Sequence, residues 1–226
     1  MKQKLIVIEG LDGSGKATQT ALLTDYFKSK SVSVKQISFP DYTNPSSALV
    51  KMYLGGEFGK NPEDVNAYAA SSFYAVDRYA SYKQFWEKDY LNGTLIIADR
   101  YATSNAVYQL SKLEETEYDR FLQWIADYEY GMLGLPKPDL TLYLDMPIEV
   151  SQKLLSKRYQ GNNSKKDLHE SNCSFLQQCR KSALYSAQKY GWKIIECSAN
   201  GQPRTITDIH NDIICALGDL HSTLLK

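Results

Sequence analysis

The sequence predicts an α/β protein built on an open, doubly wound, five-stranded parallel sheet. Three observations predict this fold class. Short runs rich in Ile, Leu and Val alternate with helical patterns, a glycine-rich loop directly follows the first run, and neither an internal repeat nor a Pro- or Ser-rich linker interrupts the alternation. A chain of 226 residues fits one domain, which we expect to span residues 1–226.

Five segments are predicted as strands. The first, third and fifth are nearly continuous in Ile, Leu and Val, which is typical of strands that helices cover on both faces. Parallel neighbours require helical crossovers, and these are right-handed. The five segments are Leu5–Glu9, Val32–Phe39, Thr94–Asp99, Leu140–Asp145 and Lys193–Cys197.

The remaining long segments have the apolar spacing and length of helices. These are Lys16–Lys30, Ser46–Leu54, Pro62–Tyr90, Glu115–Glu129, Pro147–Tyr159, Ser171–Tyr190 and Thr205–Leu224. Residues 159–167 break the pattern, because they are polar and contain Gly161 and two asparagines. Their composition fits a solvated loop as well as it fits a mobile lid, at about residues 158–168, over a bound phosphate.

Composition excludes several classes of protein. The 26 basic and 26 acidic residues balance, whereas general nucleic-acid binding requires a basic excess. The early apolar run Leu5–Ile8 is too short for a membrane span or a secretory signal. The four cysteines show no metal-binding spacing, and reduced thiols are expected. We therefore expect a cytoplasmic protein with no nucleic-acid or membrane partner.

A glycine-rich loop, Gly10-Leu-Asp-Gly-Ser-Gly-Lys16, joins the first strand to the first helix. Converging N–H groups, the helix N-terminus and the lysine ammonium together form an anion site, which predicts binding of a nucleoside triphosphate. The position after the lysine, where the pattern has Ser or Thr, holds Ala17, and the side chain of Thr18 points about 100° away from that direction. The predicted site consists of Gly10, Gly13, Ser14, Gly15, Lys16, Ala17 and Thr18.

The third strand ends in Asp99 and is followed by Arg100. Because ligands bind at the carboxyl edge of such sheets, the carboxylate is placed to hold Mg²⁺, directly or through water. The planar guanidinium suits the oxygens of a second phosphoryl group. The alternative is a capping aspartate beside an exposed arginine. Two phosphoryl groups at neighbouring strand ends indicate a kinase.

These motifs resemble the thymidylate kinase family. The stretch Ile97-Ala-Asp-Arg-Tyr-Ala-Thr-Ser-Asn-Ala-Val-Tyr108 is similar to the family signature. Three further features agree in order, namely Glu9-Gly-Leu-Asp12, Phe39-Pro40 and Leu135–Asp145. The resemblance extends from about residue 3 to the last helix, and it implies the fold of the P-loop kinases.

The resemblance implies a site for dTMP. Tyr74 would stack on thymine, and Arg78, which lies on the same helix face, would hydrogen-bond the base; core packing is the alternative for the tyrosine. Asn105 would contact a thymine edge, Tyr108 would disfavour a ribose, and Arg100 would bind the acceptor phosphate. The implied acceptor residues are Asp12, Phe39, Tyr74, Arg78, Arg100, Ser104, Asn105 and Tyr108.

The resemblance also implies the catalytic groups. Gly13 stands where some members of the family have an arginine. Members that lack this arginine supply positive charge from the lid instead, and the candidates here are Arg158, Lys165 and Lys166. The wall of the adenine pocket would lie at Ser198-Ala199-Asn200. The implied catalytic residues are Asp12, Lys16, Asp99, Arg100 and Arg158, with Lys165 and Ser198 added to the ATP site and Asp99 as the ligand of Mg²⁺.

Three features depart from the family pattern. The first is Ala17. The second is Asp41-Tyr42, which stands where an arginine commonly follows Phe39-Pro40, and Lys51 is a candidate substitute. The third is a lid sequence that is similar to a bacterial subset of the family and includes His169, for which a surface role is the alternative.

The implied reaction transfers the γ-phosphate of ATP to dTMP and gives dTDP and ADP, with Mg²⁺ and, by resemblance, a homodimer. Two alternatives stay open. One is another nucleotide or deoxynucleoside kinase on the same scaffold, and the other is a catalytically weak P-loop nucleotide-binding module. A GTPase switch lacks its sequence motifs here, since Ser164-Lys-Lys-Asp167 lies in a loop rather than after a strand.

Overall fold

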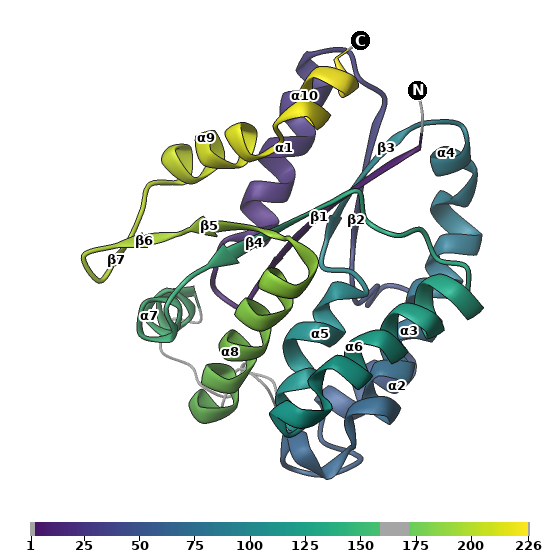
Figure 1. Cartoon of the computed structure of the whole chain (residues 1–226), viewed down its shortest axis with the longest axis vertical. Helices are drawn as coiled ribbons and strands as arrows, with labels where there is room; N and C mark the ends of the chain where they lie inside the picture. The colour runs from purple at the N-terminus through teal and green to yellow at the C-terminus, as the bar shows by residue number, and fades with distance from the viewer. Residues whose placement is uncertain (1–2, 159–171, 226) are drawn as a thin grey trace.

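The computed structural model describes residues 3–158 and 172–225 of the chain. Its centre is a five-stranded parallel sheet with the order β2-β3-β1-β4-β5 (Figure 1). The predicted sheet is therefore confirmed, with strand ends that differ from the prediction by up to two residues. The strands are β1 (Lys4–Gly10), β2 (Val34–Ser38), β3 (Leu95–Asp99), β4 (Leu140–Asp145) and β5 (Lys193–Glu196).

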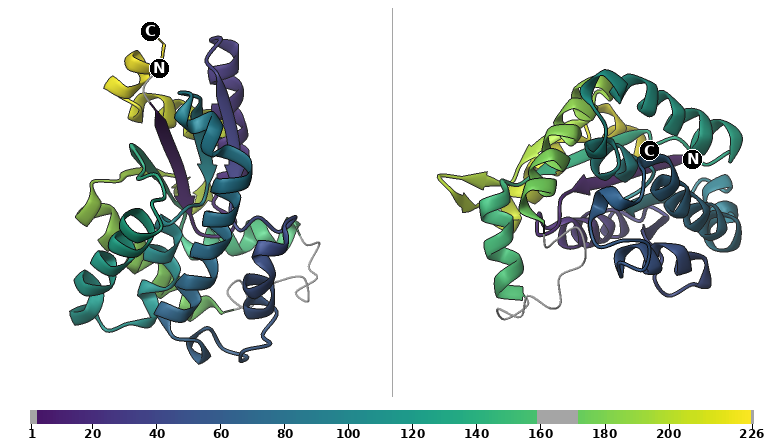
Figure 2. Two further views of the ribbon diagram at one scale, coloured as in Figure 1. Left: turned by 90° about the vertical axis from the view of Figure 1, so that its right-hand side faces the viewer. Right: turned by 90° about the horizontal axis from the view of Figure 1, so that it is seen from below.

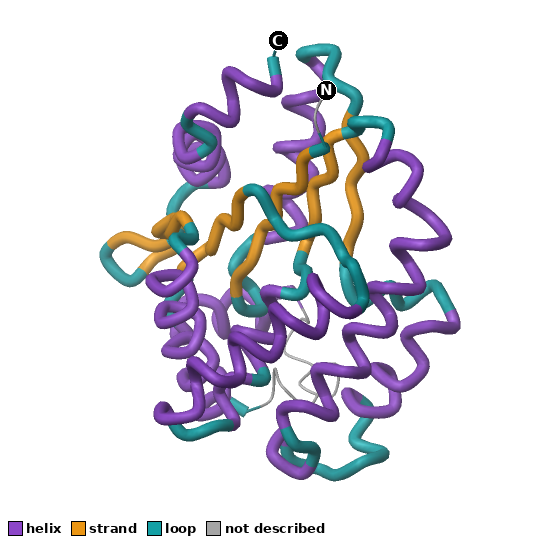
Figure 3. The backbone as a smooth tube through the Cα atoms, turned by 45° about the vertical axis from the view of Figure 1, so that its right-hand side comes forward, coloured by secondary structure: helices purple, strands orange, loops and turns teal. Residues whose placement is uncertain are grey.

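The central strand β1 is buried on both faces. Ile6 and Ile8 pack on one face against α1 (Lys16–Ser29), α9 (Ile206–Ala216) and α10 (Asp219–Leu224). Leu5 and Val7 pack on the other face, in a cluster that contains Tyr82 and Trp86. Figure 3 shows the strands passing between helices on either side. Because both faces of β1 are buried, its sequence is an unbroken apolar run rather than an alternation of apolar and polar residues.

The short helix α4 (Glu87–Leu91) lies at the amino edge of the sheet, just before β3, whereas the remaining helices lie toward the carboxyl edge (Figure 1). They are α2 (Ala48–Leu54), α3 (Ala67–Ser81), α5 (Thr103–Tyr108), α6 (Tyr118–Ile125), α7 (Ile148–Arg158) and α8 (Cys173–Tyr190). Three strands end together at this edge: Asp99 is paired in register with Ile8 of β1 and with Ser38 of β2. Polar residues just after these strands therefore converge.

The predicted helix Pro62–Tyr90 is four pieces in the structure. A 3₁₀ turn (Pro62–Asp64) begins at a capping box made by Asn61, and α3 begins separately after Asn66, which accepts the N–H of Ala69. A π-helical segment (Tyr82–Trp86) then separates α3 from α4. The N-caps Asn61 and Asn66 explain the break between the 3₁₀ turn and α3. Hydrophobic periodicity does not predict these caps.

Other boundaries also differ from the prediction. Gly218, with a positive φ of 52°, divides the expected last helix into α9 and α10. The segment predicted as helix Glu115–Glu129 ends in a π-helix (Ala126–Met132). The short helix α5 and the hairpin of β6 (Ser198–Ala199) and β7 (Gln202–Pro203) were not predicted; the hairpin projects from the body (Figure 2). The greater part of the predicted lid, residues 159–168, lies outside the described residues.

No helix within residues 3–158 or 172–225 combines the length and the apolar character needed to cross a bilayer.

Candidate active site

The glycine-rich loop leaves β1 at Gly10 and enters α1 at Lys16. Gly15 is the residue before the helix and has a φ of 91°, which favours glycine. A Cβ at Gly13 would lie 2.8 Å from the carbonyl oxygen of Ser151 in α7. The first turn of α1 holds no acidic residue, so its N-terminal positive end is uncompensated. The loop has the form of an anion site, as predicted.

Lys16 is held inside this loop. Its side chain is 7% exposed, and Nζ donates a hydrogen bond to the carbonyl oxygen of Leu11 at 2.8 Å, with the Oδ1 atom of Asp12 at 3.9 Å. Burial and the neighbouring Arg100 lower the pKa of Lys16 to about 8, against the opposing effect of Asp12 and Asp99. A phosphate at the loop would therefore raise this pKa and keep the ammonium charged in alkaline solution.

Nucleotide binding is accordingly expected to take up a proton in alkaline solution. Above pH 8 the free protein loses the Lys16 proton, and the bound phosphates favour its return. The apparent Kd for ADP should rise by up to about tenfold per pH unit above that point. Titration calorimetry at pH 9, in buffers with different ionisation enthalpies, measures the uptake. A Kd for ADP and a proton uptake that do not change between pH 7 and pH 9 would contradict the prediction. As a control, Lys16→Met should abolish the proton uptake.

The turn after β3 is the second part of the site. Arg100 adopts a positive φ of 66°, unusual for a residue with a side chain, while its N–H donates to the carbonyl of Ile8 at 3.1 Å. Beneath the turn, the carboxylate of Glu9 is fully buried and accepts bonds from the Tyr101 N–H at 3.1 Å and the Thr103 hydroxyl at 2.6 Å.

The hydroxyl of Ser104 also donates to both carboxylate oxygens of Glu9, at 2.9 and 3.0 Å. Burial raises the pKa of Glu9, and Arg100 opposes this rise. Ser104, predicted to bind substrate, therefore supports the turn through Glu9. Sequence reasoning missed this role of Glu9; a carboxylate closing an apolar strand was the available signal.

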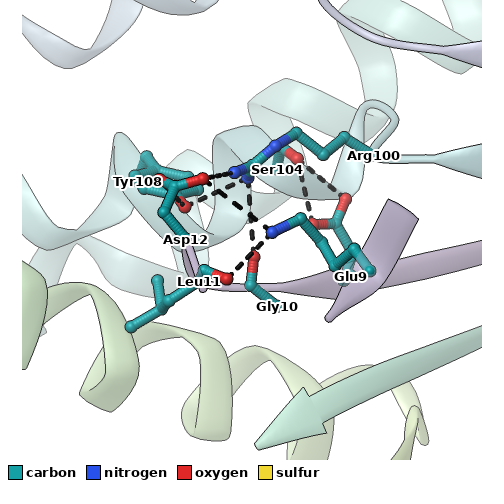
Figure 4. Close-up of polar contacts among 8 residues, drawn as sticks. Glu9, Gly10, Leu11, Asp12, Arg100, Ser104 and Tyr108 are labelled. Carbon is teal, nitrogen blue, oxygen red and sulfur yellow. Dashed lines mark hydrogen bonds and ion pairs between the residues drawn. The ribbon is translucent and has the colours of Figure 1, made fainter. Parts of the chain in front are cut away.

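Arg100, Asp12 and Tyr108 form one hydrogen-bonded cluster (Figure 4). Arg100 makes an ion pair with Asp12 through Nη2 and donates from Nη1 to the Tyr108 hydroxyl at 3.0 Å. That hydroxyl in turn donates to Oδ2 of Asp12 at 3.1 Å. Burial lowers the pKa of Arg100, but Asp12 and the smaller effects of Tyr108, Glu9 and Asp99 together outweigh it, and the net pKa lies well above the ordinary value. The guanidinium is thus fixed and fully charged at the mouth of the loop.

Asp99 lies beside this cluster with an unpaired oxygen. Its Oδ1 is buried and has no hydrogen-bond partner among the described residues. Such an orphan acceptor requires a partner, and a hydrated cation would supply one. Within residues 3–158 and 172–225 no group of three His, Cys, Asp or Glu side chains could hold a metal alone. Any divalent ion here would therefore share its coordination with a ligand and water.

One cavity of about 590 Å³ joins these parts. Its lining includes most of the predicted residues, namely Asp12, Gly13, Gly15, Lys16, Ala17, Thr18, Phe39, Tyr74, Arg78, Asp99, Arg100, Ser104, Asn105 and Tyr108. Gly10, Ser14 and Ser198 are outside the lining, and Ser198 lies in the β6–β7 hairpin. The Arg158 side chain, Lys165, Lys166 and His169 lie outside the described residues.

The far end of the cavity is where the base is expected. The ring of Phe39 is buried there, and that of Tyr74 is half-buried and packs edge-on against Tyr53. Two donor atoms of Arg78, Nε and Nη2, are committed to a two-bond ion pair with Glu129. Gln109 also lines this cavity, and its buried Oε1 has no partner in the described chain. Neither Glu129 nor Gln109 was predicted from the sequence as a residue of the site. Glu129 lies in a π-helix, which hydrophobic periodicity does not predict.

The segment after Phe39-Pro40 places no cationic side chain where the family commonly has an arginine. The Asp41 carboxylate accepts bonds from Thr43 and Asn44 of its own loop and does not line the cavity, whereas Tyr42 does. Lys51 is exposed and is not part of the lining. No lysine or arginine of residues 39–51 therefore lines the cavity.

Comparison with known proteins gives a consistent result. The profile of the thymidylate kinase family matches residues 8–213. The thymidylate kinase of Mycobacterium tuberculosis (strain ATCC 25618 / H37Rv) is 32% identical over 205 residues, covering 88% of this chain and 93% of that protein. That of Plasmodium falciparum (isolate 3D7) is 28% identical over 216 residues, covering 94% and 89%. A thymidylate kinase structure from Candida albicans shares the fold, with a TM-score of 0.68, 22% identity and coverage of 100% and 94%.

Proposed function

Because the chain belongs to the thymidylate kinase family, we propose how its residues carry out the reaction of that family. The protein is an ATP-dependent nucleoside monophosphate kinase that transfers the γ-phosphate of ATP to dTMP, giving dTDP and ADP. The alternatives on the same scaffold are not favoured. The observation that carries the assignment of residues is the single cavity with Lys16 at one end, Arg100 between, and Tyr74 with Asn105 at the other.

The two ends of the cavity bind the two nucleotides. The loop N–H groups and Lys16 hold the phosphates of ATP, and Arg100 holds the phosphate of dTMP, so that its oxygen faces the γ-phosphate in line. The attacking phosphate is already ionised near neutral pH, so the site needs no strong general base. The contribution of the protein is alignment, together with cationic groups that meet the charge spread over the transferring phosphoryl group.

Asp12 and Tyr108 act on this arrangement through Arg100. Their bonds to the guanidinium hold it before dTMP arrives, so the acceptor phosphate meets a preorganised cation. We also assign Tyr108 to the side of the sugar where a 2′-hydroxyl would lie. Tyr74 and Phe39 enclose the base, and Arg78 with Asn105 contacts its polar edge.

Asp99 fits Mg²⁺, because its buried Oδ1 is an oxygen ligand without a partner in the described residues. When bound with ATP, Mg²⁺ would neutralise charge on the β- and γ-phosphates. Ala17 offers no oxygen to this ion, so Asp99 is the protein group that we assign to it.

Asp99→Asn should therefore raise the Mg²⁺ concentration needed for half-maximal turnover by about tenfold or more, since one carboxylate charge is lost. Ala17→Ser supplies the missing hydroxyl and should lower that concentration. Turnover and nucleotide binding are measured against Mg²⁺ concentration. The same Mg²⁺ dependence in Asp99→Asn and the unchanged protein would exclude Asp99 as the ligand.

A coupled assay of ADP release tests the function. With ATP and Mg²⁺, dTMP should be turned over far faster than dCMP, dGMP or free thymidine. Fastest turnover of a free nucleoside would support the other kinase class. Absence of ADP release with every acceptor would support a binding module.

We further propose that the protein is a homodimer. Apolar side chains stay exposed on α3 and in the following π-helix, with Val76 at 42%, Tyr79 at 41% and Phe85 at 45% exposure. A second copy would cover them, and analytical ultracentrifugation measures the mass directly. A cytoplasmic location and the lack of a nucleic-acid partner stay predictions from the sequence.

A further inference from the structure

Three polar side chains from three separate elements meet behind the base end of the cavity. Arg78 comes from α3, Asn105 from α5 and Glu129 from the π-helix after α6. All three are buried, with exposures of 1%, 2% and 1%. Arg78 donates to Glu129 from Nε at 2.7 Å and from Nη2 at 2.5 Å, and Nδ2 of Asn105 donates to Oε1 of Glu129 at 2.8 Å. One carboxylate thus binds both residues that we assign to the base.

These contacts fix which way the Asn105 amide points. Its Nδ2 faces two acceptors, Oε1 of Glu129 and the carbonyl oxygen of Ser71 at 3.4 Å. An oxygen in that position would face both acceptors with no proton between them, so the amide cannot be turned over while the carboxylate is present. Asn105 lines the cavity, and its Oδ1 atom is therefore the acceptor that faces it.

The same carboxylate fixes what Arg78 can offer. Its Nε and one Nη2 proton are committed to Glu129, whereas no described residue accepts a bond from Nη1. An arginine never accepts a hydrogen bond, so this end of the cavity presents one donor from Arg78 beside one acceptor from Asn105.

This pair is the complement of one pyrimidine edge. Thymine and uracil present an acceptor at O4 and a donor at N3, whereas cytosine presents a donor at the 4-amino group and an acceptor at N3. We propose that Glu129 is a positioning residue that sets the hydrogen-bonding polarity of the base site, and thereby selects 4-oxo over 4-amino pyrimidine nucleotides. The proposal rests on the assignment of Arg78 and Asn105 to the base.

The test is Glu129→Gln, which keeps the shape but replaces one acceptor by an NH₂ group. In the native protein Oε1 accepts from both Arg78 Nη2 and Asn105 Nδ2, and Oε2 accepts from Arg78 Nε. The glutamine has one oxygen for these three donors, so in either orientation its NH₂ group opposes at least one donor of Arg78. Arg78 is then no longer held by two bonds, and the donor and acceptor that face the base lose their fixed arrangement. The ratio of kcat/KM for dTMP to kcat/KM for dCMP should fall by about thirtyfold or more, because buried polar groups are mispaired for thymine. The KM for dTMP should account for most of the fall, with the KM for ATP within about twofold of the unchanged protein.

A matched control is Asp139→Asn. Asp139 binds Lys4 at 2.6 Å and the N–H of Leu5 at 2.9 Å, far from this cavity, and it does not line it. This variant loses an ion-paired carboxylate as Glu129→Gln does, so it should lower thermal stability and leave the base ratio unchanged. A Glu129→Gln protein with native circular dichroism and an unchanged base ratio would overturn the proposal.

A second measurement needs no variant. In crystals of the unchanged protein with dTMP, Asn105 should contact Glu129 through one amide atom and N3 of thymine through the other. A Glu129 turned away from both Arg78 and Asn105 would overturn the proposal even if Glu129→Gln fails to fold. Lack of dTMP turnover by the unchanged protein would instead count against the function itself.

Discussion

Replacing Arg100 with alanine should reduce kcat/KM for dTMP by about a thousandfold, the loss expected for a preorganised cation that meets a phosphate in a mostly buried site. Two effects add. The acceptor phosphate loses its guanidinium, and the Asp12 carboxylate, which loses the Arg100 charge beside it, repels the incoming dianion more strongly. Because the ATP site is formed by another segment, the KM for ATP should change little. Steady-state kinetics with each nucleotide varied in turn measures both constants.

Arg180→Ala is the matched control for this prediction. Arg180 also makes a two-bond ion pair, with Asp145 at 2.7 Å through both bonds, but it does not line the cavity. The control should retain kcat/KM for dTMP within about threefold, as surface ion pairs contribute little. If Arg100→Ala were as active as the control, the acceptor phosphate would have to bind elsewhere.

Replacing Lys16 with methionine should lower kcat by about a thousandfold, with a smaller effect on the KM for dTMP. The apolar stem is preserved, so the main loss is the ammonium at the transferring phosphoryl group. The ammonium donates to the Leu11 carbonyl at 2.8 Å, and a bound phosphate would compete for this donor. Single-turnover measurements at saturating ATP separate the chemical step from nucleotide binding.

Lys112→Met gives the corresponding control. Lys112 is half-buried, burial lowers its pKa to about 8 as it does for Lys16, and Nζ donates to the Tyr53 hydroxyl at 2.8 Å. It lies outside the lining of the cavity. Its loss should reduce stability by about 1–2 kcal/mol without reducing kcat. Equal loss of kcat in the two variants would indicate that the Lys16 effect is structural.

The fold and the phosphate end of the site could be predicted from the sequence because both depend on local patterns. The apolar strand before Gly10 and the carboxylate at Asp99 are each visible within a few residues, and the structure places them at one sheet edge. Family resemblance then identified Arg78 and Asn105, both of which line the cavity.

The supports of these residues could not be predicted in the same way. Glu9 and Glu129 act across 94 and 51 residues of sequence, on Thr103 and Arg78. Their burial depends on the assembled fold, and no periodic pattern distinguishes a buried acid that has partners from an exposed one. The π-helix that holds Glu129 also shifts the phase of the helix by one residue, which removes the regular spacing.

The close approach of Gly13 to α7 restricts how this enzyme could change during evolution. A Cβ at this position would meet the backbone oxygen of Ser151 at 2.8 Å and the Leu155 side chain at 3.1 Å. A larger residue at position 13, such as arginine, therefore requires α7 to move outward. The choice of residue 13 and the placement of α7 are thus physically coupled in this fold.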